Sequence, residues 1–326
     1  MCRTYNGYDM NADSGVNPQT KDGRGNIAPV TIILPTIAMM AKMDENKSFF
    51  SILSKKIDEA KDMLIERFEL ICSQSIESAK FMYENNVMLG SNGKDVFSAM
   101  KHGTLAIGQI GLAETLQILI GKDHTTKEGM ELAKQIEELF HEKCNEFKHE
   151  KHYTPERGEY YLNFGVYYTP AENLCFTAMK KFKEKYGVIQ NVSDKDFFTN
   201  SIHVPVWVRM NPFEKIDIES ELTGYSNAGC ITYVELDDKT RYNYVAVEEI
   251  VQYAMDHDIP YFAINVPCDT CMDCGYCGEI KEDDCPRCHS NKIQRLRRVT
   301  GYLTGNYTTA FNKGKQQEVE LRVKHM

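Results

Sequence analysis

An α/β architecture with a largely buried sheet is the fold class that this sequence predicts, and two observations support it. Short apolar runs typical of strands alternate with stretches of helical periodicity through the second half of the chain. The 326 residues, of which 42% are hydrophobic and 26% charged, can also bury a sizeable core in one large or two ordinary domains.

The first half of the chain predicts a loop, a strand and two helical regions. Residues 2–25 are polar and rich in Asn, Asp and Gly, which favours a loop, and the apolar run Val30 to Pro35 predicts a buried strand. From Lys47 to about Asn85, apolar residues recur at helical spacing over a length that allows one very long helix or two. A further helix is expected over 127–146.

The second half predicts strands separated by helices. Strands are expected at 161–167, 201–208, 230–236 and 261–266, and helices around 171–185 and 246–257. The clearest boundary lies near Pro267, where the composition turns to Cys, Asp and Gly.

The charge and hydropathy of the chain exclude several classes of protein. A formal net charge of -9 argues against a whole-protein affinity for nucleic acid or acidic membranes. No run approaches the roughly 20 apolar residues of a membrane span, and the first residues lack the features of a signal peptide. We therefore expect a cytoplasmic protein with neither a membrane nor a nucleic-acid partner.

The cysteines are concentrated in one segment. Six of the eleven fall between Cys268 and Cys288, which indicates metal binding in a reducing compartment. Two C-x-x-C knuckles facing each other would offer four thiolates in a tetrahedral array, which suits zinc and closes its coordination sphere. Because a closed site has no position for a substrate, its expected role is to stiffen the local fold.

The spacing leaves the upstream knuckle open. Cys285 and Cys288 form one pair, but Cys271 with Cys274 and Cys274 with Cys277 both fit the other. An iron–sulfur cluster is the rival, since ferredoxin-like runs also use C-x-x-C-x-x-C. The distance to the second pair favours zinc.

Segments along the whole chain resemble one known family. R-V-x-G-Y-L surrounds Gly301 near one end, and Cys2-Arg3-Thr4 stands at the other. Between them lie GRGNIAPVTIILP (23–35), IGQIGLAE (107–114), YTPAEN (168–173), TNSIHVPV (199–206) and SNAGCITYVEL (226–236). In this order, the set resembles the anaerobic, class III ribonucleotide reductases, which are glycyl radical enzymes.

The resemblance implies a fold and a division of the chain. The fold would be the second half of a ten-stranded α/β barrel of the glycyl radical enzyme type, with a finger loop. Residues 1–266 would form the partial catalytic barrel, 267–290 a four-cysteine zinc module, and 291–326 the radical loop and tail. The family's metal ligands align with Cys271, Cys274, Cys285 and Cys288, which leaves Cys268 and Cys277 as additional cysteines.

The resemblance also implies a radical chemistry. A radical-SAM activase would take a hydrogen atom from the α carbon of Gly301, where no Cβ obstructs a planar radical. The radical would pass to Cys2, whose thiyl form abstracts the ribose 3′ hydrogen of a bound ribonucleoside triphosphate before the 2′ hydroxyl leaves as water. Asn26 would hydrogen-bond near the ribose, and Glu172 would lie close to its hydroxyls. His203, in an apolar run, is expected to be structural.

The same resemblance implies missing parts and partners. The family's upstream half normally supplies an allosteric ATP-binding cone and the first half of the barrel. We therefore expect a separately encoded N-terminal half, as in a split gene, and a homodimer of the assembled enzyme. An incomplete reading frame is the competing explanation.

Other functions compete with this reading. The basic tail from Asn291 onward, after a zinc knuckle, is also typical of a zinc-ribbon protein that binds nucleic acid. A relative of pyruvate formate lyase would share the radical glycine but not a four-cysteine site before it. A third alternative is an inactive fragment of a glycyl radical enzyme with a folded zinc module.

Overall fold

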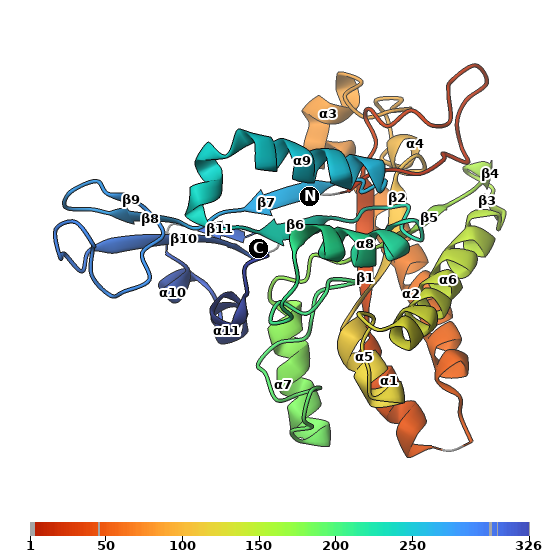
Figure 1. Ribbon diagram of the computed structural model, residues 1–326. Coiled ribbons are helices and arrows are strands. Elements are labelled where there is room, and N and C mark those ends of the chain that lie inside the picture. The colour runs from red at the N-terminus through yellow and green to blue at the C-terminus, as the bar shows by residue number, and fades with distance from the viewer. Residues whose placement is uncertain (1–3, 45, 300–301, 305, 326) are drawn as a thin grey trace. The chain divides into compact units, whose positions relative to one another are not determined.

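The computed structural model describes residues 4–44, 46–299, 302–304 and 306–325. The chain divides into two compact units, and Figure 1 labels their helices and strands. The first unit comprises Met1–Gln109, Glu131–Thr169 and Gly224–Cys230, and the second comprises Ile110–Met130, Pro170–Thr223 and Ile231–Met326. Both contain parallel strands and helices, so the predicted α/β class is confirmed.

The first unit is built on a three-stranded sheet. Its order is β1-β2-β5, and β2 runs parallel to β5, from Thr104 opposite Asn163 to Gly108 opposite Tyr167. All residues of β2 and β5 are buried, as expected of a sheet covered on both faces. The elements are β1 (Asn26–Ile33), α1 (Leu34–Met43), α2 (Phe49–Cys72), η1 (Ile76–Ala79), α3 (Lys80–Glu84), α4 (Phe97–Met100), β2 (Thr104–Ile110), most of α6 (Lys127–Lys148), β3 (His152–Thr154), β4 (Gly158–Tyr160) and β5 (Asn163–Tyr167).

Two predicted boundaries in this unit change. The strand expected up to Pro35 ends at Ile33, and α1 begins at Leu34, because proline is well tolerated in the first turn of a helix. The helical region expected to reach Asn85 is one helix that ends at Cys72, followed by short turns of helix.

The helix α2 forms because one side of it is continuously apolar. Its buried residues recur every three or four positions, and the helix contacts both β1 and α1. The hydroxyl oxygen of Ser48 caps the first turn by accepting a hydrogen bond from the backbone amide of Ser51 at 3.2 Å.

The second unit combines a parallel pair with an antiparallel sheet. Strand β6 runs parallel to β7 through the crossover helix α9, and the core beneath them includes Ile216, Val234 and Ile250. The antiparallel sheet has the order β11-β10-β8-β9. The elements are α5 (Leu112–Ile120), α7 (Leu174–Tyr186), α8 (Pro212–Thr223), β6 (Thr232–Glu235), η2 (Asp238–Tyr242), α9 (Tyr244–Asp256), β7 (Phe262–Asn265), β8 (Cys268–Cys271), β9 (Cys277–Gly278), β10 (Ile293–Val299), β11 (Tyr302–Thr304), α10 (Tyr307–Ala310) and α11 (Lys313–Leu321).

The strand predicted over 201–208 is wrong. This segment is irregular, and Ser201 has a φ of 43°, which an extended strand cannot contain. The segment is held by side chains instead of a ladder, since the Glu219 carboxylate accepts a hydrogen bond from the backbone amide of Val204 at 3.0 Å. The alternation of apolar residues in this segment therefore indicates burial and not a strand.

Among the described residues, no helix is both long enough and apolar enough to cross a bilayer.

Candidate metal centre and active-site residues

Two tight turns build the candidate metal centre. Cys271 ends β8, and its carbonyl oxygen accepts a hydrogen bond from the amide of Gly275 at 3.0 Å. The carbonyl of Cys285 accepts in the same way from His289 at 2.9 Å. Each turn closes on a residue with positive φ, 70° at Gly275 and 58° at His289. These paired turns form two knuckles that point their thiols toward each other.

The four cysteines of these knuckles form one cluster. The Sγ atoms of Cys271, Cys274, Cys285 and Cys288 all lie within 4.8 Å of one another. The Cys271–Cys288 and Cys274–Cys285 separations are 3.5 and 3.6 Å. Thiolates about 2.3 Å from a tetrahedral zinc ion would be roughly 3.8 Å apart. The cluster therefore fits a metal such as zinc, with all four positions filled by protein.

The structure selects between the two possible upstream knuckles. Cys271 and Cys274 belong to the cluster, whereas Cys268 and Cys277 do not. The Sγ atoms of the latter two lie 3.8 Å from each other. The three consecutive C-x-x-C spacings therefore do not act as one ligand run, which disfavours a ferredoxin-like cluster.

Polar contacts hold the knuckles to each other. The Asp273 carboxylate accepts hydrogen bonds from the Ser290 hydroxyl at 2.6 Å and from the Lys292 ammonium at 3.2 Å. These contacts link the loop that carries Cys274 to the chain just after Cys288. We call residues 268–299, which hold both knuckles and β8 to β10, the cysteine module.

A buried ion pair connects β8 to β10. Asp269 is fully buried. Its carboxylate accepts hydrogen bonds from Nη1 and Nη2 of Arg297, the one from Nη2 at 2.9 Å. Its carboxylate also accepts from the backbone amide of Ile280 at 2.9 Å. Because a buried carboxylate needs such partners, the pair fixes how β10 lies against the cysteine-bearing strand.

Asn26 is the first residue of β1, and only the nitrogen of its side-chain amide has a described hydrogen-bond partner. Its Nδ2 donates to the carbonyl oxygen of Ala228 at 3.0 Å. Its Oδ1 is buried, and no described residue donates a hydrogen bond to it. This orientation leaves a fixed acceptor, which is what a residue near a ribose hydroxyl would need.

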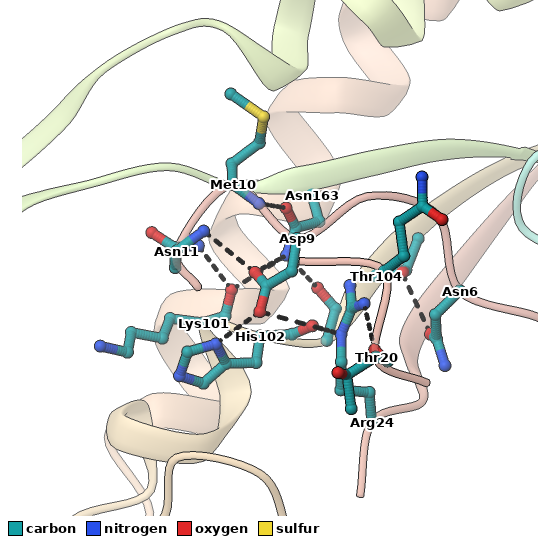
Figure 2. A network of polar contacts seen from close by, with 12 residues as sticks. Asn6, Asp9, Met10, Asn11, Thr20, Arg24, Lys101, His102, Thr104 and Asn163 are labelled. Atoms are coloured by element: carbon teal, nitrogen blue, oxygen red, sulfur yellow. Dashed lines mark hydrogen bonds and ion pairs between the residues drawn. The ribbon is translucent and has the colours of Figure 1, made fainter. Parts of the chain in front are cut away.

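The loop before Asn26 is anchored by a polar network centred on Asp9 (Figure 2). The Asp9 carboxylate lies 2.7 Å from Nδ1 of His102 and accepts from Nδ2 of Asn163 at 3.1 Å. The Arg24 guanidinium donates to the His102 carbonyl at 2.7 Å and to the carbonyls of Gly7 and Thr20. Loop, β2 and β5 are thereby joined at the end where β1 begins.

The electrostatics of Asp9 follow from this network. Burial acts to raise the pKa of Asp9, but the hydrogen bonds from His102, the Asn11 amide and Asn163 outweigh it and lower the pKa. The carboxylate therefore stays charged, and its negative charge is balanced inside the loop. Sequence alone gave no sign of this pairing, because the residues are far apart along the chain.

Glu172 lies just before α7 in the second unit. It is partly exposed, and no described residue hydrogen-bonds its carboxylate. The neighbouring backbone is fixed, because the amide of Ala171 donates to Oδ1 of Asn200 at 2.8 Å. The backbone beside Glu172 is thus held in place.

His203 has structural partners. Its Nδ1 lies 3.3 Å from Oε1 of Glu219, a fully buried carboxylate that also contacts Lys215. Burial opposes the charge on Glu219, but Lys215 and His203 overcome it and hold the pKa of this carboxyl well below its usual range. The arrangement is a satisfied internal ion cluster.

Two buried carboxyl groups escaped sequence reasoning. Glu114 accepts from the amide and hydroxyl of Thr199 at 2.9 and 2.7 Å, and burial raises its pKa. Glu137, on α6, accepts from Gln109 at 2.7 Å, and burial raises its pKa to about 8. A single Glu on a helical pattern looks like a solvated residue, so the sequence carried no signal for either.

Cys2 and Gly301, the predicted thiyl and glycyl radical positions, lie outside the described residues.

Comparisons with known proteins cover the whole chain. A family model described as anaerobic ribonucleoside-triphosphate reductase matches residues 1–325. The anaerobic ribonucleoside-triphosphate reductase of Escherichia coli K12 is 33% identical over 339 residues, covering 100% of this chain and 45% of that protein. Its counterpart from enterobacteria phage T4 is 32% identical over 319 residues, covering 93% and 49%.

Solved structures agree in fold. An anaerobic ribonucleotide reductase matches with a TM-score of 0.73 at 23% identity, covering 94% of this chain and 46% of that one. The Thermotoga maritima anaerobic ribonucleotide reductase with glycerol in the active site matches with a TM-score of 0.70 at 22% identity, covering 92% and 46%. The chain spans about half the length of the curated relatives that it matches.

Proposed function

The chain belongs to the anaerobic ribonucleoside-triphosphate reductase family, and from this premise we propose that it performs part of the anaerobic reduction of ribonucleoside triphosphates. The product would be the deoxyribonucleoside triphosphate, made by glycyl and thiyl radical chemistry. The observation that carries the proposal is the match over residues 1–325. Asn26 supports it from the geometry, because its Nδ2 is fixed on Ala228 and no described residue donates a hydrogen bond to its Oδ1.

The proposed roles are those that the family resemblance implies. Gly301 would carry the radical installed by a radical-SAM activase, and Cys2 would form the thiyl radical that attacks the ribose. Asn26 would accept a hydrogen bond from a ribose hydroxyl through Oδ1, while Glu172 would bond the hydroxyls or accept a proton. Positioning would dominate, because a thiyl radical displaced by about an ångström would react with protein.

The proposal includes a structural zinc ion on Cys271, Cys274, Cys285 and Cys288. With four thiolate ligands the ion would have no open position, so its contribution would be to fold the cysteine module. The division into 1–266, 267–290 and 291–326, the first part being the second half of a ten-stranded barrel, also belongs to this proposal. So does a cytoplasmic, reducing setting, which keeps thiolates available to the metal.

The proposed assembly follows from the comparisons. The relatives are about twice as long as this chain. We propose that the N-terminal half of the family's sequence completes the barrel, and that the assembled enzyme is a homodimer. That half would supply neighbouring strands for the sheet, since exposed sheet edges are otherwise prone to association.

The experiment that tests this function measures the radical. The chain, its activase and the N-terminal half are co-expressed without oxygen, and the glycyl doublet is sought by electron paramagnetic resonance. Oxygen is then admitted and masses are determined. We expect a doublet followed by cleavage at Gly301, both abolished by Gly301→Ala. Gly224→Ala is the control, because an added Cβ at Gly224 meets nothing within 4 Å.

A second measurement separates radical formation from turnover. Asn26→Ala should leave the doublet intact and lower the rate of ribonucleotide reduction about 100-fold, the usual effect of losing one oriented polar group. A full loss of the doublet in this variant would show a folding role instead. No doublet in any complex, despite bound zinc, would contradict the proposed function.

The nucleic-acid alternative is weakened by the partners of the basic residues. Arg297 pairs with Asp269, Arg322 with Glu235 at 2.9 Å, and Lys315 with Glu318 at 2.7 Å. Arg295 donates to the backbone carbonyls of Ile280 and Glu282. These cations are committed within the chain, so few of them are available for phosphates.

A further inference from the structure

The two cysteines outside the metal cluster form a third thiol pair. Cys268 is the first residue of β8 and Cys277 begins β9, and their Sγ atoms lie 3.8 Å apart. In the register of these strands, Cys277 stands opposite Thr270. Cys268 and Thr270 share a face of the strand, so Cys268 and Cys277 are diagonal neighbours on that face.

The distance between the Sγ atoms of Cys268 and Cys277 is not far from that of a disulfide bond. A disulfide joins two sulfur atoms at about 2.05 Å, so the two thiols would have to approach by less than about 2 Å. Diagonal neighbours of an antiparallel pair lie about 7–8 Å apart, slightly beyond the usual Cα separation in a disulfide, so bond formation would combine side-chain rotation with a small backbone shift. The pair is also accessible, because Cys277 is exposed and Cys268 is partly exposed.

Metal binding would direct oxidation to this pair. The other two close contacts, Cys271–Cys288 and Cys274–Cys285, join thiols of the metal cluster. A bound metal ion keeps its four thiolates occupied, and so protects them from exchange. The described thiols outside the cysteine module, Cys72, Cys144, Cys175 and Cys230, are all buried. Burial raises the pKa of the first three to about 12, which leaves them almost entirely protonated and unreactive.

We propose that Cys268 and Cys277 are a reversible dithiol–disulfide site, whose co-reactant is a small-molecule or protein disulfide. The proposal does not depend on the reductase activity.

The exchange balances in two steps. The Cys277 thiolate attacks one sulfur of the co-reactant disulfide, which releases one thiol and leaves a mixed disulfide on Cys277. The Cys268 thiolate then displaces the second thiol and forms the Cys268–Cys277 bond. Two protein thiols are oxidised, one disulfide is reduced to two thiols, and the two protons move to the departing thiolates.

The bond would enclose the first knuckle. The segment between Cys268 and Cys277 contains both Cys271 and Cys274. A covalent link across its base restricts the conformations available to these two ligands when the metal leaves. The oxidised form should therefore lose its metal ion more slowly than the reduced form.

The test uses the full chain loaded with zinc. It is equilibrated without oxygen in mixtures of oxidised and reduced glutathione, quenched with an alkylating agent, and mapped by mass spectrometry, while bound zinc is measured in parallel. We expect one intramolecular disulfide between Cys268 and Cys277, a retained zinc ion, and full reversal by excess reduced glutathione. Zinc transfer to a chelator should then be several-fold slower in the oxidised chain.

Variants separate this site from the metal cluster. Cys268→Ser and Cys277→Ser should both bind zinc normally and form no intramolecular bond, with Cys268→Ser stopping at the mixed disulfide. Cys72→Ser, which removes a buried thiol of the first unit, should leave the bond unchanged. Independent alkylation of Cys268 and Cys277 under oxidising conditions would overturn the proposal. So would loss of zinc in either serine variant, since the two residues would then serve the metal.

Discussion

The parallel sheet of the first unit and the antiparallel sheet of the cysteine module differ in what surrounds their strands. Every residue of β2 and β5 is buried. In the cysteine module, by contrast, two of the four residues of β8 are only partly buried, and so are most of those of β10. The first sheet can be stabilised by apolar burial, whereas the second has less of it and carries four cysteines that could add a metal ion to its stability. The two regions should therefore fail under different conditions.

The largest expected effect is on the cysteine module alone. Cys285→Ser should lose the metal ion and with it the folding free energy that the ion supplies, about 10 kcal/mol in small zinc modules. Hydrogen exchange should show residues 268–299 unprotected while β2 and β5 stay protected. Cys277→Ser is the matched control and should keep both zinc and protection. Equal loss of protection in the first unit would break the comparison.

The next effect belongs to the first unit and depends on pH. The pKa of Glu137 is raised from 4.5 to about 8, so folding favours its neutral form. Its contribution to stability is complete below about pH 4.5 and is lost as the pH rises through 8, a change of about 5 kcal/mol. Glu137→Gln should remove this dependence, as followed by denaturant unfolding with hydrogen exchange of α6. Glu138→Gln, an exposed neighbour on α6, should leave the dependence in place.

A smaller loss should follow from the loop network. Asp9→Ala leaves His102 and Arg24 without their buried anion and should destabilise the first unit by about 3 kcal/mol. Increased proteolysis between residues 6 and 24 is the measurement, with the zinc content unchanged. Asp13→Ala, in the same loop but exposed, serves as the control. An equal effect of the two substitutions would show that the network adds nothing.

The smallest effect is local to one helix. Ser48→Ala removes the cap of α2 and should cost about 1 kcal/mol of unfolding free energy in the first unit. Ser51→Ala, one turn later, removes an exposed hydroxyl that caps nothing and should be neutral or slightly stabilising. Chemical denaturation followed by circular dichroism would show the difference, and identical curves would argue against the cap.

The sequence predicts the site in the cysteine module better than the polar network in the first unit. The cysteine spacing alone indicated a metal site, and the resemblance chose Cys271 and Cys274, which the structure brings together with Cys285 and Cys288. Local spacing suffices there because each knuckle is a short turn. The network around Asp9 was not predictable, since it joins Asp9 to His102 and Asn163 through tertiary contacts.

Two errors have a common physical origin. The residues 201–208 alternate like a strand, but Ser201 and the contacts of Val204 with Glu219 make them an irregular buried segment. The run to Pro35 is apolar throughout, and a proline in the first helical turn divides strand from helix. Hydrophobicity reports burial, and the backbone geometry is decided by neighbours that the pattern does not contain.

The pairing of strand β10 could depend on the cell's supply of metal. It pairs with β8 from Ile293 opposite Cys271, and with β11 from Val299 opposite Tyr302. The strands on both sides of positions 300 and 301 are therefore aligned by the same sheet that carries a metal ligand. If a metal ion holds this sheet together, a cell short of that metal should make the chain in normal amount but with the pairing of β8, β10 and β11 weakened, so that nutrient scarcity would appear as a shortage of competent protein.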